Sequence, residues 1–226
     1  MSGQLSVVIP VHNGAKFIDR CLNSALNATP NAEIIIVENG STDNSWETLL
    51  KWQKYDLTLF QIQDSNKCLA RNFGANKATR DLITFLDQDD ELTEDISEVL
   101  KVIVNDPKIE GVISTQEFEF EEEFIPTYFH KAHSLNLPMY HPMAFVMRRK
   151  TFLDLGGFDS SKSKAEDFSL VAKFVNANQK LVFSAAKTVK RHFHQANDSH
   201  NIVEARSELF QVLRQKTKNI GWENVI

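Results

Sequence analysis

The residues from Phe85 to Asp90 offer the clearest chemistry in this chain. A run of apolar or β-branched residues, Ile83–Leu86, leads directly into Asp87-Gln88-Asp89-Asp90, so three acids stand within four positions. Like charges at this spacing repel one another and resist burial. A hard cation such as Mg²⁺ or Mn²⁺ would relieve the repulsion, because such ions prefer oxygen ligands and share them with substrate phosphates. The alternative is a strand that ends in a solvated acidic turn.

Residues 1–115 contain the elements that must position this turn. Apolar runs that predict strands alternate with segments of helical spacing. The expected strands are 5–11, 34–37, 57–62, 82–86 and 111–115, and the expected helices are 17–26, 46–50, 67–78 and 92–104. This alternation indicates an α/β fold with a parallel sheet that is covered by helices on both faces.

Polar residues follow three of the expected strands. His12-Asn13 follows the first strand, Glu38-Asn39-Gly40 the second, and the acidic turn the fourth. Ligands bind to open parallel sheets beyond the carboxyl ends of the strands. We therefore expect the three clusters to converge on one edge of the sheet, which favours a binding site there.

The pattern of residues 116–226 is less regular. Residues 118–124 predict an edge strand or a solvated turn, and residues 124–142 predict a binding loop or a connection. The remaining expected elements are helices at 148–155, 168–175 and 201–218 and a short strand at 181–183. No repeat or linker divides the chain, so we expect one domain over residues 1–226.

The composition, 42% hydrophobic and 24% charged, indicates a globular protein. A net charge of −5 without a Lys/Arg-rich block argues against a nucleic-acid partner. Neither a signal peptide nor a run of about 18 apolar residues that could span a membrane is visible. The two cysteines, Cys21 and Cys68, fall in helical patterns and are expected to be reduced, so we expect a cytoplasmic protein.

Five segments, taken in order, resemble the family 2 glycosyltransferases. Each is degenerate alone, but the five together are specific and extend from residue 5 to about residue 170. They are Ser6-Val-Val-Ile-Pro-Val-His-Asn13, Val37-Glu-Asn-Gly-Ser-Thr-Asp43, Ala70-Arg-Asn-Phe-Gly74, the DxD-type motif Phe85–Asp90, and Gly156-Gly-Phe-Asp159 followed by Glu166-Asp167.

The resemblance implies a GT-A fold. This fold is a single α/β domain with a Rossmann-like, mostly parallel central sheet flanked by helices, a small mixed region on the acceptor side and a C-terminal helix. A nucleotide-binding half, 1–115, and an acceptor-binding half, 116–226, are implied as well.

The reaction that the resemblance implies moves a sugar from a nucleotide-diphosphate donor to an acceptor hydroxyl, with inversion at the anomeric carbon. UDP- or dTDP-sugars are the favoured donors, and the acceptor would be a carbohydrate or a lipid-linked molecule. With a lipid-linked acceptor, the enzyme would work at the inner face of the membrane through peripheral contact.

The implied metal site uses the acidic turn. The leaving diphosphate develops charge that a divalent cation, Mn²⁺ or Mg²⁺, can neutralise. Asp89 is the first choice as ligand, with Asp87 and Asp90 beside it, and Asp87 can instead hold the ribose or sugar hydroxyls of the donor. His194 matches a family histidine that completes metal or diphosphate coordination, since a neutral imidazole suits Mn²⁺. The alternative for His194 is an exposed loop residue.

The implied catalytic base is Asp167. Inverting transfer requires a group that accepts the proton of the acceptor hydroxyl, and Asp167 matches the catalytic acid of the family's Glu-Asp pair. Its partner Glu166 would orient the acceptor or raise the pKa of a neighbour. The alternative is that both are favourable acids in the first turn of a helix.

The implied nucleotide site begins at the turn after the second strand. Glu38 can accept the imide N–H of uracil or thymine, while Asn39 replaces a second acid that is common in the family and leaves the choice of base open. Asp43 is expected to cap the next helix rather than to touch the donor.

Other residues are expected around the donor. Pro10, His12 and Asn13 would meet the base and ribose, and His12 would pack there or form hydrogen bonds. Arg71 would bind the diphosphate in a bidentate manner or form a salt bridge to one of the motif acids. Lys67 is a weaker phosphate candidate.

Two other functions compete with this one. A sugar-nucleotide nucleotidyltransferase also uses an open α/β sheet and metal-binding acids, but Val11-His-Asn-Gly-Ala15 lacks its Gly-rich, basic phosphate loop. A non-catalytic nucleotide-sugar-binding protein would not need Asp167 and the three motif acids.

Overall fold

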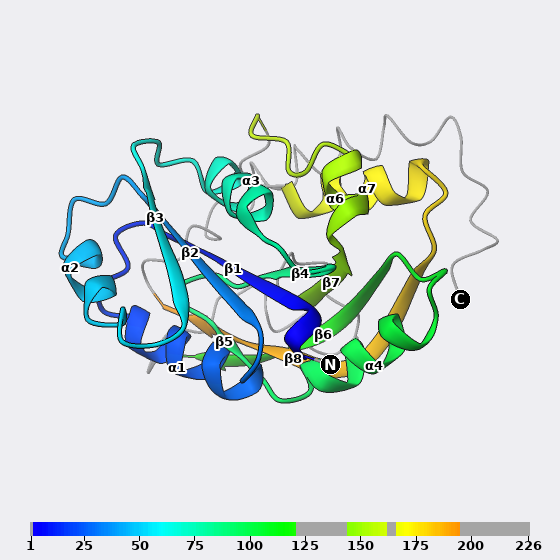
Figure 1. Cartoon of the computed structure of the whole chain (residues 1–226), viewed down its shortest axis with the longest axis horizontal. Coiled ribbons are helices and arrows are strands. Elements are labelled where there is room, and N and C mark those ends of the chain that lie inside the picture. Colours follow the sequence, from blue (N-terminus) through cyan, green and yellow to red (C-terminus); the bar gives the residue numbers. More distant parts are fainter. Residues whose placement is uncertain (1, 121–143, 162–165, 195–226) are drawn as a thin grey trace.

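The apolar runs of the first half form buried strands at the centre of a mixed sheet (Figure 1). Every residue of β1 (Leu5–Val11) is buried, and β2 (Glu33–Asn39) is buried after its first residue. Continuous burial of this kind requires cover on both faces, as the sequence predicted. The structure is a computed structural model that describes residues 2–120, 144–161 and 166–194.

The other described elements follow in chain order. A short 3₁₀ turn, Ser2–Gln4, precedes β1, and α1 (Ile18–Ala28) lies between β1 and β2. The elements after β2 are α2 (Ser45–Leu50), β3 (Leu57–Ile62), α3 (Lys67–Lys77), β4 (Leu82–Phe85), β5 (Glu91–Leu92), α4 (Ile96–Asn105), β6 (Gly111–Phe120), β7 (Phe145–Arg148), α6 (Arg149–Asp154), α7 (Glu166–Asn176) and β8 (Leu181–Phe193).

The sheet has the strand order β3-β2-β1-β4-β7-β6-β8-β5. The strands β3, β2, β1 and β4 run parallel to one another, whereas β7 is antiparallel to both of its neighbours, β4 and β6. The strands β6 and β8 are parallel, and the short β5 pairs antiparallel with β8. The predicted α/β fold with a mostly parallel sheet is therefore confirmed.

Helices cover the two faces of the sheet in separate layers. In Figure 1, α3, α6 and α7 lie above the sheet, and α1 and α4 lie below it. Alternate residues of one strand supply the two cores: Ile34 and Ile36 pack on the side of α1, whereas Ile35 and Val37 pack on the side of α3. The helix α3 approaches the sheet closely, because a Cβ on Gly74 would lie 2.4 Å from a methyl carbon of Val8.

The second half of the sheet differs from the prediction. The strand β7 was not predicted, and it occupies the residues just before the expected helix 148–155, which begins at Arg149. Glu91–Leu92 form β5 by pairing with β8, so the helix expected from residue 92 begins at Ile96. Four-residue and two-residue strands are too short to show a periodicity.

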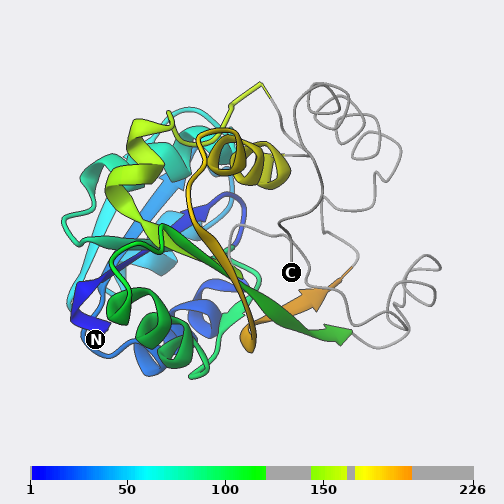
Figure 2. The ribbon, with the colours of Figure 1, turned by 90° about the vertical axis from the view of Figure 1, so that its right-hand side faces the viewer.

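The strands β6 and β8 are much longer than predicted. They extend to Phe120 and Phe193, pair with each other over this length, and project from the rest of the described sheet (Figure 2). The pairing contains register shifts between Ile113 and Gln116, which explains why alternation in this segment is irregular. Residues 118–120 are thus part of a paired strand, and residues 184–193, which follow the expected strand 181–183, also belong to β8.

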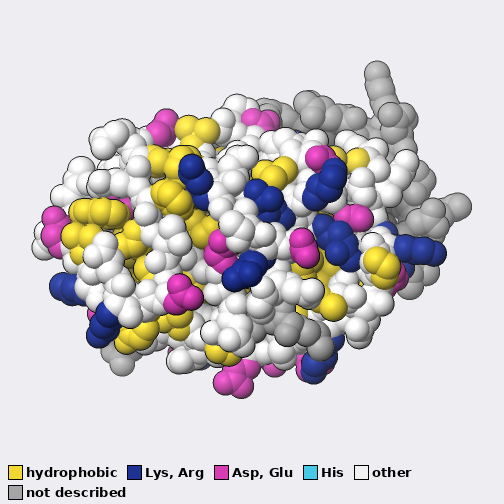
Figure 3. Space-filling view, viewed as in Figure 1, with side chains coloured by type: hydrophobic (Ala, Val, Ile, Leu, Met, Phe, Trp, Pro, Cys, Tyr) yellow, Lys and Arg dark blue, Asp and Glu magenta, His cyan; other side chains and the backbone are white. Residues whose placement is uncertain are grey.

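Several expectations lie outside the described residues. They concern the loop 124–142 and the helix 201–218. Among the described helices, none combines the length and apolar character that crossing a membrane demands. The face shown in Figure 3 carries interspersed basic and acidic side chains, in keeping with the small net charge.

Candidate functional site

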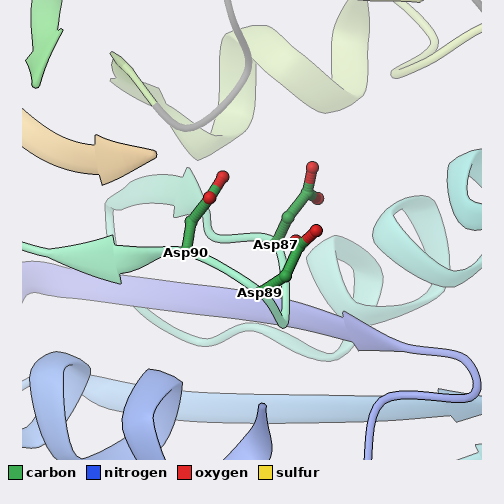
Figure 4. Close-up of side chains that lie close together, drawn as sticks. All are labelled: Asp87, Asp89 and Asp90. Carbon is green, nitrogen blue, oxygen red and sulfur yellow. The ribbon is translucent and has the colours of Figure 1, made fainter. Parts of the chain in front are cut away.

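The three acids of the turn after β4 lie together, as the sequence predicted. Oxygen atoms of Asp87, Asp89 and Asp90 lie within 4.8 Å of one another, and the three side chains point to the same side of the loop between β4 and β5 (Figure 4). Burial raises the pKa of Asp90 well above its ordinary value, and the charges of Asp89 and Asp87 raise it further. This donor set fits a hard divalent cation, since bound positive charge would offset both the burial and the repulsion.

Backbone contacts hold this acidic turn in place. The Asp90 carboxylate accepts a hydrogen bond from the His192 N–H of β8 at 2.8 Å. From the other side, a guanidinium nitrogen of Arg20 in α1 donates to the Asp89 carbonyl oxygen at 2.7 Å. Elements from both ends of the chain therefore determine where the acids lie.

The side chain of Gln88 joins the acidic turn to the end of β1. Its Oε1 accepts from the His12 N–H and its Nε2 donates to the His12 carbonyl oxygen, both at 2.8 Å. A Cβ on Gly14 would lie 2.1 Å from Gln88 Oε1, so a larger residue at this position would displace the Gln88 amide. This role of Gln88 was not predicted, because a glutamine between acids carries no local signal of its partner.

His194 lies beside the acidic turn. Its Nε2 is 3.1 Å from Asp89 Oδ2, and its ring stacks on Phe17 with centroids 4.5 Å apart. The residue directly follows β8 and is buried, so the alternative of an exposed loop histidine is wrong. His192, in contrast, contacts Glu91 Oε1 through Nε2 at 2.6 Å.

The carboxylate of Glu38 shapes the turn after β2. Its two oxygens accept hydrogen bonds from the Ser41 N–H at 2.5 Å and from Gln61 Nε2 at 2.8 Å, and the side chain is buried. Asn39 is also buried, and neither polar atom of its amide has a hydrogen-bond partner in the structure. The Asn39 amide therefore has unused hydrogen-bonding capacity, and each Glu38 oxygen can accept one further bond.

The residues at the end of β1 connect this turn to the acidic turn. His12 Nδ1 is 2.9 Å from the Asn39 carbonyl oxygen, so the histidine forms hydrogen bonds. Asn13 has a positive φ of 51°, and its Oδ1 accepts from the Thr42 N–H at 2.8 Å. Pro10 pairs with Val37 inside the sheet.

Asp43 serves the start of α2, as expected. Its Oδ1 accepts from the Ser45 N–H at 3.0 Å, and its Oδ2 accepts from the Ala15 N–H at 3.2 Å. Partial burial acts to raise the pKa of Asp43, but hydrogen bonds from the Ser45 hydroxyl and from the Ala15 and Ser45 N–H groups lower it overall.

Arg71 is fully buried and forms the salt bridge that was one of its two expected roles. One guanidinium nitrogen pairs with Asp87, and the other lies 3.2 Å from Glu166 Oε1. Lys67, one turn earlier in α3, contacts the same Glu166 oxygen at 2.6 Å. Both cations predicted for phosphates thus pair with acids, and the first acid of α7 is tied to the acidic turn.

Asp167 stands at the start of α7, partly buried. Burial raises the pKa of Asp167 to about 7, the neighbouring charge of Glu166 acts in the same direction, and Lys67 and Arg71 oppose the shift. A carboxylate whose pKa lies near neutrality is suited to accept a proton at physiological pH.

Comparison with solved structures shows the fold. The mannosyltransferase PcManGT from Pyrobaculum calidifontis, in complex with GDP-Man and Mn²⁺, matches with a TM-score of 0.76 at 18% identity, over 96% of this chain and 65% of that one. S. aureus TarS in complex with UDP-GlcNAc matches with a TM-score of 0.73 at 17% identity, over 94% and 65%. These neighbours are GT-A glycosyltransferases, so the expected GT-A fold is confirmed.

Comparison with curated proteins gives relatives of higher identity. Glycosyltransferase GlyG of Streptococcus pneumoniae serotype 4 is 33% identical over 134 residues, 58% of this chain and 44% of that protein. Glycosyltransferase GlyA of the same organism is 35% identical over 100 residues, 43% of this chain and 14% of that protein. The matched region spans less than half the length of these relatives.

A family model described as "Glycosyl transferase family 2" matches residues 6–160, which are more than half of the chain. This range includes β1, the turn after β2, α3, the acidic turn and the Gly156-Gly157 turn. The chain therefore belongs to glycosyl transferase family 2.

Proposed function

We propose that the chain transfers a sugar from a nucleotide-diphosphate donor to an acceptor hydroxyl, with inversion and with a divalent metal ion. The observation that carries this proposal is the cluster of Asp87, Asp89 and Asp90 at the carboxyl end of β4. Family membership argues against the nucleotidyltransferase alternative.

Asp87, Asp89 and Asp90 would hold Mn²⁺ or Mg²⁺, with His194 adjacent. When bound, the ion would supply positive charge next to the leaving diphosphate. One structural neighbour, PcManGT, was solved with Mn²⁺ and GDP-Man, which supports a metal without deciding between the two ions.

Asp167 would accept the proton of the acceptor hydroxyl as that oxygen attacks the anomeric carbon. The buried acid Glu166, paired with Lys67 and Arg71, keeps negative charge next to Asp167 and so favours its basic character. Attack from the face opposite the leaving diphosphate would invert the configuration. The acceptor, a carbohydrate or a lipid-linked molecule, would be bound by the half from residue 116 onward.

Uracil or thymine is the base that we propose for the donor. Glu38 and Asn39 would read this base together, because each Glu38 oxygen accepts one hydrogen bond and keeps a second lone pair, while the Asn39 amide has no hydrogen-bond partner. The Asn39 amide can accept the imide N–H and donate to the adjacent carbonyl of these bases. TarS was solved with UDP-GlcNAc and PcManGT with GDP-Man, so GDP is the nucleotide to compare with UDP and dTDP in a binding experiment.

Thermal unfolding with UDP, dTDP or GDP, each with and without Mn²⁺, tests the donor site. A ligand that binds only the folded chain stabilises it by about 2.7 kcal/mol at 100 times its dissociation constant. We expect a rise in Tm with UDP or dTDP that depends on Mn²⁺ and is lost in Asp89→Asn. No metal-dependent rise with any nucleotide would contradict the donor site, and stabilisation without transfer or hydrolysis would favour a non-catalytic binding protein.

A further inference from the structure

The helix α3 contacts both halves of the site through one short segment. Lys67 and Arg71 of this helix pair with Glu166 of α7, and Arg71 also pairs with Asp87 of the acidic turn. The next residue, Asn72, forms two hydrogen bonds with the backbone of Phe158, in the turn before α7: its Nδ2 donates to the carbonyl oxygen and its Oδ1 accepts from the N–H, both at 2.9 Å.

The contact between Asn72 and that turn leaves little room for a side chain at Gly157. A Cβ on Gly157 would lie 2.4 Å from Asn72 Oδ1. Asn66, which caps α3, donates in addition to the Ser160 carbonyl oxygen at 3.0 Å. Hydrogen bonds from Asn66 and Asn72 therefore join α3 to the residues 158–160 that precede α7 in the chain.

The Arg71 guanidinium can pair with two carboxylates at the same time. Its side chain is 0% exposed, and its guanidinium carbon lies 5.4 Å from the centre of the Phe158 ring. A planar guanidinium presents donors in a rigid fork and can hold two carboxylates in a defined relation, which the single ammonium group of lysine cannot do. Removing this cation would take away the buried positive charge that the Asp87 and Glu166 carboxylates share.

We propose that Arg71 is a positioning residue that sets the metal-binding acid Asp87 and the start of α7, with the base Asp167, relative to each other. In this role Arg71 does not contact the donor diphosphate. The inference rests on the proposed function, in that it assumes that Asp87 serves the metal and Asp167 the acceptor. With this role for Arg71, α3 connects the acidic turn that binds the donor to the start of α7, which carries Asp167.

The variants Arg71→Lys and Arg71→Met test this role, with Arg149→Met as the matched control. Arg149 also lies next to α3, but its guanidinium donates to the Ala75 and Asn76 carbonyl oxygens at the end of the helix. Three quantities are measured for each folded variant: binding of UDP and GDP in EDTA by calorimetry, binding of Mn²⁺ alone by electron paramagnetic resonance, and the kcat and donor KM of transfer.

We expect Arg71→Lys to bind the metal-free nucleotides within about twofold of the wild type and to bind Mn²⁺ about tenfold more weakly, as happens when a residue that orients a metal ligand is changed. The kcat should fall about 100-fold, with little change in the donor KM, because misplacement of the reacting groups by about 1 Å has an effect of this size. Arg149→Met should lower Tm and leave all three quantities unchanged at a permissive temperature.

A tenfold loss of metal-free UDP or GDP binding in either Arg71 variant would show that Arg71 binds phosphates and would overturn the inference. Unchanged Mn²⁺ binding and kcat in Arg71→Lys would do the same. Arg71→Lys retains the buried positive charge, so it decides the question even if Arg71→Met does not fold. A wild-type chain that binds neither Mn²⁺ nor any nucleotide would instead contradict the proposed function itself.

Discussion

At the scale of single residues, the environment of Asp167 explains how an ordinary carboxylic acid could accept a proton at neutral pH, as the proposed base must. An exposed aspartate would be a weak base, because its pKa is far below the working pH. In this chain, partial burial and the adjacent Glu166 raise the pKa of Asp167 to about 7, although two cations oppose the shift. The acid next to the proposed base therefore has an electrostatic function, and it forms ion pairs with Arg71 and Lys67.

Replacing Asp167 by Asn should abolish transfer, with a loss of about 10²–10⁴-fold expected for a general base. The metal-dependent rise in Tm with nucleotide should remain, because the acidic turn is unaltered. In the wild type, kcat/KM should increase as pH rises through about 7, since Asp167 must be deprotonated to act. Initial rates across this pH range test both expectations, and loss of nucleotide binding in Asp167→Asn would count against its role as base.

At the scale of elements, hydrogen bonds to α1 and to the end of β1 fix the position of the acidic turn. Arg20 of α1 donates to the Asp89 carbonyl oxygen, and Gln88 bonds twice with the backbone at the end of β1. The close approach of Gly14 to Gln88 shows how tightly these two turns fit. Movement of one turn would therefore move the other.

A double-mutant cycle of Gly14→Ala and Gln88→Ala tests this fit. Gly14→Ala alone should destabilise the chain by about 1–3 kcal/mol, the usual effect of adding volume to a close contact. In the Gln88→Ala background the added methyl group has space, so its effect should largely disappear. Free energies of unfolding from urea titrations provide the measurement, and additive effects would show that the two side chains do not meet.

At the scale of the whole molecule, the raised pKa of Asp167 makes folding stability depend on pH. Asp167 has a pKa of about 7 in the folded chain against an ordinary value of 3.8, so the folded state binds this proton more tightly than the unfolded state does. The resulting stabilisation is complete below the unfolded pKa and is lost as pH rises through the folded pKa. Above neutral pH, the charge of Asp167 therefore opposes folding.

Asp167→Asn should consequently unfold at a higher denaturant concentration than the wild type at pH 8, because it lacks this charge. The difference should grow between about pH 4 and pH 7 and stay constant above that range, as the two pKa values require. Urea titrations at a series of pH values measure the difference, with Asp154→Asn, an exposed acid on α6, as the control. A difference that does not change with pH would contradict the raised pKa.

The parallel half of the fold was predictable from the sequence because its strands are continuous apolar runs with helices between them. The mixed half was not, since β7 and β5 are too short to show a period, and β6 and β8 pair with shifted register over a long separation in the chain. The residues that converge at the acidic turn were predictable in kind, because carboxylates after a buried strand stand out locally.

The acids of the site, the strand ends that carry them and the order of the motifs could all be read from the sequence. The groups that these residues contact became visible only in the folded chain. Glu38 bonds with Ser41 and Gln61, and Arg71 joins Asp87 to Glu166 rather than facing solvent. The physical reason is that periodicity and local composition report which side of an element is buried, whereas the partner of a buried charge depends on how distant segments pack against that side.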